Sequence, residues 1–199
     1  MKHLLNPLIH DYIQTEKELE DNLLNHYTKK YNYDELIKRA LLGTDERGKK
    51  HPHKYRIDNS VYPRIRQYLL LLENKFNTCS TFDEVMKLVY EVKKSPLGSG
   101  FGSVSIYDTA LCLAVNKKEY PKVIYLHAGA YEGAENLFGK RELKQMVSYF
   151  QEDKEFPYLS LDQLPKPFKQ LQPHHIENFF CIYRSELKEI NVKLLNMQS

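Results

Sequence analysis

The chain has 199 residues, 42% of them apolar and 28% charged, a balance that is typical of a globular protein and excludes a disordered one. Its three cysteines, Cys79, Cys112 and Cys181, lie far apart without a C-x-x-C pair, which argues against a disulfide framework and a zinc knuckle. The net charge is only +3, and no apolar run resembles a signal peptide or approaches the roughly 18 residues of a membrane span, so we expect a cytoplasmic protein.

Three amphipathic helices are expected in the first part of the chain, over residues 6–29, 33–42 and about 62–77. Asn6 and Pro7 predict the start of the first helix, because Asn caps a helix and Pro suits its first turn. Gly43 predicts the end of the second helix. Residues 43–59 have no apolar period and are expected to form a basic loop.

Four further helices are expected in the rest of the chain, over residues 82–94, 103–115 and 129–139 and from Pro173 onward. Thr81 and Glu84 form a capping box before the first of these, and Ser95-Pro96 ends it. Only Val123–Leu126 is a candidate strand. We therefore predict an all-α fold with at least half of the residues in helices and no sheet of three or more strands.

The whole chain is expected to form one helical domain, with residues 60–199 as its core and residues 1–59 as a helical extension that carries the basic loop. Charge is unevenly distributed between these parts. Residues 29–66 contain eleven Lys or Arg against five Asp or Glu, a net charge of +6, whereas the rest of the chain carries −3. Such an asymmetry favours one basic face that suits a polyanion, although a charge run is more often a solvated face.

A glycine-rich hairpin joins two of the predicted helices. Gly100 and Gly102 allow a tight turn and a close approach of another backbone, with Phe101 between them. The helix that follows directs free N–H groups and its positive dipole end outward, and Ser103 and Ser105 add hydroxyl donors. This arrangement suits a phosphate oxygen. The alternative is a plain helical hairpin in which the glycines serve only the turn.

Residues 82–127 resemble the helix-hairpin-helix motif of DNA-binding proteins, in which a Gly–apolar–Gly hairpin grips a backbone phosphate. The resemblance implies that Gly100, Phe101, Gly102 and Ser103 contact nucleic acid. Members of that family usually place Pro-Gly in the hairpin and Ala four residues after the second glycine. Here Pro96 lies four residues before Gly100, and Ile106 takes the Ala position. The stretch from Gly100 to Ala134 also resembles small uncharacterised bacterial proteins.

DNA glycosylases built on this motif carry a run such as Val-Asp-Thr-His about twenty residues further on, with a catalytic Asp. In this chain Tyr125 stands at the Asp position and His127 matches the His. The resemblance therefore implies binding to DNA and not base excision.

The basic loop contains a second candidate site. His51 and His53 are spaced as a His-x-His metal pair but lack a convincing third ligand, so we expect no metal. Contact with phosphates is the better functional interpretation, and a solvated loop is the alternative. The cations concerned are Lys49, Lys50, Lys54 and Arg56.

Together these features predict a non-catalytic protein without a cofactor that binds duplex DNA through the hairpin and the basic loop. Two alternatives stay open. One is an enzyme acting on a small phosphorylated or acidic substrate with Asp108 and His127 as acid–base groups, and the other is a helical interaction module without a ligand. His174 and His175 follow Pro173 at a helix start and are expected on the surface.

Overall fold

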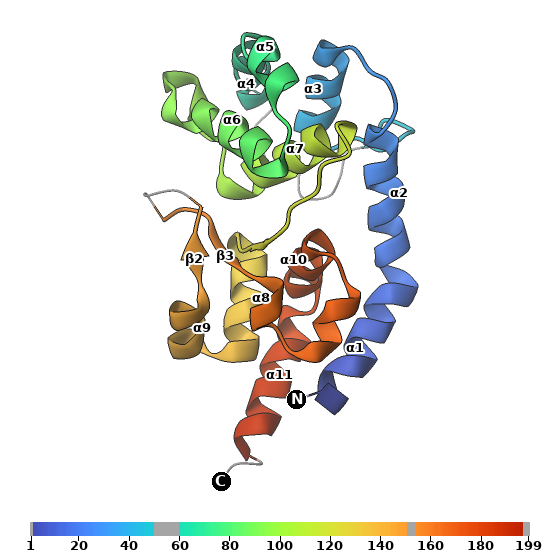
Figure 1. The fold of residues 1–199 in the computed structure, drawn as a ribbon, viewed down its shortest axis with the longest axis vertical. Helices are drawn as coiled ribbons and strands as arrows, with labels where there is room; N and C mark the ends of the chain where they lie inside the picture. The colour runs from blue at the N-terminus through green and yellow to red at the C-terminus, as the bar shows by residue number, and fades with distance from the viewer. Residues whose placement is uncertain (1, 50–59, 151–153, 197–199) are drawn as a thin grey trace. The chain divides into compact units, whose positions relative to one another are not determined.

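The computed structural model describes residues 2–49, 60–150 and 154–196. Helices account for 71% of the chain, which confirms the prediction that at least half of the residues are helical. Within the described ranges there are eleven α-helices, three short 3-10 helices and three strands (Figure 1). Among these helices, none combines the length and the apolar composition that a bilayer crossing requires.

The chain divides into two compact units. Unit 1 contains residues 1–20 and 122–199, and unit 2 contains residues 21–121. The boundaries at residues 20 and 121 differ from the boundary at residue 59 that we expected between extension and core. Unit 1 is discontinuous in sequence, whereas unit 2 is one continuous stretch.

Unit 2 consists of helices joined by turns and loops. It contains the end of α2 (Lys17–Tyr27) and the helices α3 (Tyr33–Leu42), α4 (Val61–Leu70), α5 (Glu73–Thr78), α6 (Phe82–Lys94) and α7 (Ser103–Asn116). The central helix is α7, which is buried along most of its length from Ser105 to Val115. The core around α7 is formed by apolar side chains of α3, α4 and α6, among them Ile37, Ile65, Val85 and Val89.

Local signals position the ends of α3 and α6 as predicted. The Asn32 side chain accepts a hydrogen bond from the Glu35 backbone N–H, and Gly43 closes α3 in the left-handed conformation with φ of 56°. Both halves of the Thr81–Glu84 capping box are formed at the start of α6.

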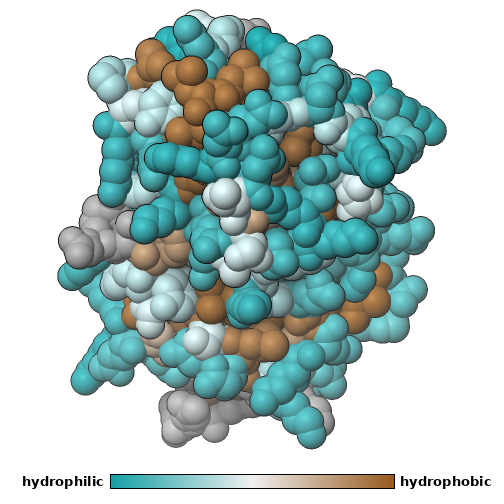
Figure 2. Space-filling view, turned by 45° about the horizontal axis from the view of Figure 1, so that its top comes forward, coloured by the Kyte–Doolittle hydropathy of each residue, from teal (hydrophilic) through white to brown (hydrophobic). Residues whose placement is uncertain are grey.

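The predicted helix over residues 62–77 is interrupted. A turn at Leu71 and Leu72 separates α4 from α5, and Leu71 is 79% exposed while Leu72 is buried. The apolar run therefore does not form one buried helix face, because the turn directs one of its leucines to solvent. Figure 2 shows hydrophobic residues in the upper part of the view and in a band across its lower part, among residues that are mainly hydrophilic.

Unit 1 contains α1 (Lys2–Thr15), α8 (Ala128–Phe138), α9 (Lys140–Met146), α10 (Pro173–Ile182) and α11 (Arg184–Asn196). Its core joins Leu5 and Ile9 of α1 to Phe179 and Phe180 of α10. Helix α8 confirms the helix predicted over residues 129–139, and it packs closely on α10 at Gly133. A Cβ at Gly133 would lie 2.0 Å from the carbonyl oxygen of Phe180.

A small antiparallel sheet in unit 1 contradicts the prediction of no three-stranded sheet. Its strands are β1 (Ile124–Tyr125), β2 (Ser148–Tyr149) and β3 (Pro157–Leu159), in the order β1-β3-β2. Ile124 pairs with Leu159, and Ser148 pairs with Tyr158. Strands of two or three residues are too short to show an alternating pattern, so the pairing comes from tertiary contacts. The fold is mostly helical, not all-α.

Two predicted helix boundaries are also wrong. Helix α1 begins before Asn6 and contains Pro7 in its first turns, and the chain from there to Tyr27 forms two helices that meet near Glu16. The last predicted helix likewise divides at Tyr183 into α10 and α11. In both places the apolar period continues across the break, so periodicity alone did not reveal it.

Candidate functional site

The hairpin between α6 and α7 contains three glycines with different roles. Gly98 is buried, and a Cβ there would lie 2.3 Å from the Val92 carbonyl oxygen. Gly100 is exposed with φ of +84°, a conformation that favours glycine. Gly102 is exposed with an ordinary φ of −80°, and a Cβ there would have no atom within 4 Å. The backbone at Gly102 is therefore open to an approaching group.

Helix α7 begins at the hairpin without a side-chain cap. Gly102 is its N-cap residue, with an extended backbone at ψ of 172° and no side chain that could accept from the first amides. Ser103 is half-buried and Ser105 is buried, so of the two predicted hydroxyl donors only Ser103 has partial access to solvent. Phe101 is only 2% exposed and its side chain belongs to the core of unit 2.

Basic side chains lie beside the hairpin. Arg64 of α4 donates from Nη2 to the carbonyl oxygen of Ser99 at 3.3 Å and from Nε to the carbonyl oxygen of Ser60 at 3.4 Å. Lys93 and Lys94 are exposed in the last turn of α6, and a Cβ at Gly98 would lie 2.6 Å from the Cα of Lys93. The sequence analysis did not single out these three cations, although Arg64 belongs to the basic stretch 29–66.

The basic loop is described only in part. Lys49 is exposed, while Lys50, Lys54 and Arg56, together with His51 and His53, lie outside the described residues. The Asp45 carboxylate accepts from the backbone N–H groups of Arg47 and Lys49, at 2.9 and 2.8 Å, and so fixes the turn that leads into the loop.

Some cations of the basic stretch are already paired with carboxylates. Arg66 binds Asp34 through two hydrogen bonds of 2.8 and 2.6 Å, and Lys29 pairs with Glu46. The excess of basic residues counted in the sequence therefore overstates the positive charge that this stretch offers to a partner.

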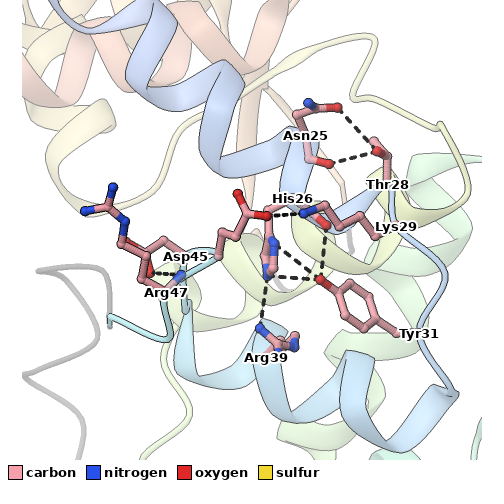
Figure 3. A network of polar contacts seen from close by, with 9 residues as sticks. Asn25, His26, Thr28, Lys29, Tyr31, Arg39, Asp45 and Arg47 are labelled. Carbon is pink, nitrogen blue, oxygen red and sulfur yellow. Dashed lines mark hydrogen bonds and ion pairs between the residues drawn. The ribbon is translucent and has the colours of Figure 1, made fainter.

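A polar network in unit 2 surrounds His26, which is only 6% exposed (Figure 3). Arg39 of α3 donates from Nη1 to His26 Nε2 at 3.1 Å, and the Tyr31 hydroxyl lies 3.2 Å from each ring nitrogen. Burial, then the neighbouring Arg39 and Lys29, lowers the pKa of His26. The sequence analysis missed this group because it is assembled from residues 26 to 46 by folding.

Unit 1 contains a second group of buried ionisable side chains. His127 Nε2 lies 3.0 Å from Glu177 Oε1, and both residues are buried. His174 and His175 are each 1% exposed, which corrects the expectation that they lie on the surface. His175 Nδ1 lies 3.1 Å from the hydroxyl of Tyr12 on α1, so these histidines face the core rather than solvent.

The proposed acid–base pair of Asp108 and His127 is divided between the units. Asp108 lies on α7 in unit 2, where it is half-buried, and His127 precedes α8 in unit 1. The carboxylate seen beside His127 within unit 1 is that of Glu177. The comparisons with protein families, with curated proteins and with solved structures found no match.

Proposed function

We propose that unit 2 binds the phosphate backbone of duplex DNA at the hairpin of residues 98–103, without catalysing a reaction. In this proposal the exposed backbone at Gly100 and Gly102 and the first amides of α7 receive one phosphate. Arg64, Lys93 and Lys94 supply the surrounding positive charge, and the basic loop extends the contact along the backbone.

One observation carries the proposal. The Arg64 side chain donates to the carbonyl oxygen of Ser99, so the end of the basic stretch and the glycine hairpin adjoin within unit 2. Two features that are separate in the sequence thus support one binding surface. The hairpin lies at the start of a helix of 14 residues, where the dipole adds to the attraction for an anion.

The burial of Phe101 favours contact with the phosphate backbone of DNA over contact with the DNA bases. Proteins that hold single strands present exposed aromatic rings on which bases stack. The aromatic ring of this hairpin is in the core instead. Binding should therefore tolerate different sequences and fall steeply as salt concentration rises, since phosphate contacts release counterions.

The variant Gly102→Asp tests the proposal. At an extended N-cap position, Asp accepts from the first amides of α7 and adds a negative charge where the phosphate would bind. The folded protein should gain roughly 0.5 kcal/mol in stability. Its affinity for duplex DNA should nevertheless fall at least about tenfold, the equivalent of roughly 1.4 kcal/mol, in a fluorescence anisotropy titration at about 0.1 M salt.

Thr81→Asp is the matched control, because it adds the same charge at another N-cap in unit 2. Thr81 lies at the opposite end of α6 from the hairpin, and a helix of 13 residues spans roughly 20 Å. This control should change affinity less than about threefold, since the added charge lies beyond the Debye length of about 10 Å at 0.1 M salt. Equal losses in the two variants, or no binding by the parent protein at micromolar concentration, would refute the proposal. If the protein does not bind DNA, the alternative of a helical interaction module without a ligand is favoured.

The His127–Glu177 pair supports a second candidate, an enzyme acting on a small phosphorylated or acidic substrate. A histidine oriented by a carboxylate is a common general base. This candidate requires a substrate-dependent turnover that His127→Gln abolishes while the far-ultraviolet circular dichroism stays that of the parent.

A further inference from the structure

The interaction of Arg39 with His26 defines the charge state of the histidine. A guanidinium has N–H donors and no acceptor, so the nitrogen that Arg39 approaches at 3.1 Å has to be the acceptor. His26 Nε2 therefore carries no proton in this arrangement, and the ring is the neutral tautomer with its proton on Nδ1. The Tyr31 hydroxyl lies 3.2 Å from both ring nitrogens and therefore out of line with either N–H, so the contact with Arg39 alone assigns the tautomer.

The groups that face His26 come from four segments of unit 2. The end of α2 and the residues after it contribute Tyr27, whose ring meets that of His26 edge-on, and Lys29. The loop before α3 contributes Tyr31, and α3 itself contributes Arg39. The turn after α3 contributes two carboxylates, Asp45 and Glu46, which oppose the effect of the cations. Glu46 is paired with Lys29, and Arg39 is paired with Glu35 at 2.7 Å.

The same residues hold the turn of residues 43–49. The Tyr27 hydroxyl, next to His26, lies 3.0 Å from the carbonyl oxygens of both Arg39 and Thr44. Asp45 then fixes the rest of the turn through the amides of Arg47 and Lys49. The position of Arg39 is thus linked both to His26 and to the turn that leads into the basic loop.

We propose that the contact between His26 and Arg39 is a pH-dependent switch, which we call the latch. When His26 is neutral, the contact joins α2 to α3 and the following turn, and when His26 is protonated, the contact is lost. Protonation places an N–H on Nε2, opposite the N–H of Arg39, so the hydrogen bond is lost and two positive charges meet. Arg39 and the turn at residues 43–49 then lose one of the contacts that hold them against α2. The latch does not depend on DNA binding.

The sign of the pH dependence follows from the lowered pKa of His26 in the folded protein. The unfolded chain takes up a proton near the ordinary pKa of about 6.5, whereas the folded protein resists protonation until a lower pH. The stabilisation is therefore complete above about pH 6.5 and is lost as the pH falls from there through the folded pKa. One linked proton changes the unfolding equilibrium constant by at most about tenfold per pH unit.

Nitrogen-15 NMR of the histidine rings in the parent protein tests the latch directly. We expect His26 at pH 7.5 to show the tautomer with its proton on Nδ1 and to titrate below pH 6.5. Arg39→Met should raise the pKa of His26, because it removes a cation and the hydrogen bond to Nε2. A proton on Nε2 at pH 7.5, or a titration of the parent at or above pH 6.5, would overturn the proposal.

A stability measurement gives the second test. Urea unfolding between pH 7.5 and 5.0 should show a smaller loss of stability in His26→Gln than in the parent, because the amide does not titrate. His10→Gln, which replaces an exposed histidine of α1, should keep the dependence of the parent. Identical pH profiles for the parent and His26→Gln would overturn the latch. If His26→Gln does not fold, the NMR titration of the parent decides alone.

Discussion

Of the three glycines in the hairpin, Gly98 is the one at which a side chain would collide with the backbone. Its missing Cβ would lie 2.3 Å from the Val92 carbonyl oxygen and 2.6 Å from the Lys93 Cα, and both are backbone atoms that cannot rotate away. Gly98→Ala should therefore force the end of α6 from its position and cost about 2 kcal/mol or more of unfolding free energy. Denaturant unfolding of the purified variant measures this loss.

Gly102→Ala provides the comparison within the same hairpin. No atom would lie within 4 Å of the new Cβ, and the φ of −80° suits alanine. Only the weaker N-capping by alanine opposes the change, so we expect a loss within about 1 kcal/mol. Equal destabilisation by the two alanines would show that Gly98 is not packed as described.

At the level of single residues, the sequence predicted that Gly100 and Gly102 lie in a turn, because glycines between two amphipathic helices are typical of a turn. The contact of Arg64 with Ser99 and the burial of His174 and His175 could not be predicted. Each depends on a partner distant in sequence, and the Tyr12 hydroxyl that meets His175 lies 163 residues away.

Among the helices, α6 provides the clearest test of local signals. Thr81→Ala removes the side chain that accepts from the Glu84 backbone N–H and breaks the capping box. We expect a loss of about 1 kcal/mol of unfolding free energy. Gln67→Ala, an exposed change inside α4, should stay within about 0.5 kcal/mol in the same denaturant experiment. A Thr81→Ala variant as stable as the parent would contradict the role given to the cap.

The same comparison explains which elements were predictable. The bounds of α6 follow from residues 81–96 alone, since a capping box and a proline mark its two ends. The sheet of unit 1 has no such local signal. Its central strand β3 begins at Pro157, in a stretch for which no helix or strand was predicted, and it becomes a strand only by pairing with β1 and β2.

At the scale of the molecule, the basic loop should determine the salt dependence of DNA binding. The combined change of Lys49, Lys50, Lys54 and Arg56 to Gln should lower affinity and reduce the slope of log affinity against log salt by about one unit per lost phosphate contact. The free energy of unfolding should change little, because Lys and Arg side chains are rarely buried in proteins and substitutions of such residues seldom cost more than about 0.5 kcal/mol. Titrations at several salt concentrations measure the slope. An unchanged slope would remove the loop from the interface and leave the hairpin as the contact.

The discontinuity of unit 1 has a consequence for how the chain folds during synthesis. Unit 2 is complete once residue 121 has left the ribosome, whereas Leu5, Ile9 and Tyr12 of α1 must wait for Phe179 and its neighbours before their core exists. Contacts of such long sequence separation form slowly, because the intervening loop must be closed first. The apolar face of α1 is thus exposed on the nascent chain until α10 (Pro173–Ile182) has been made, which gives a general chaperone time to bind there.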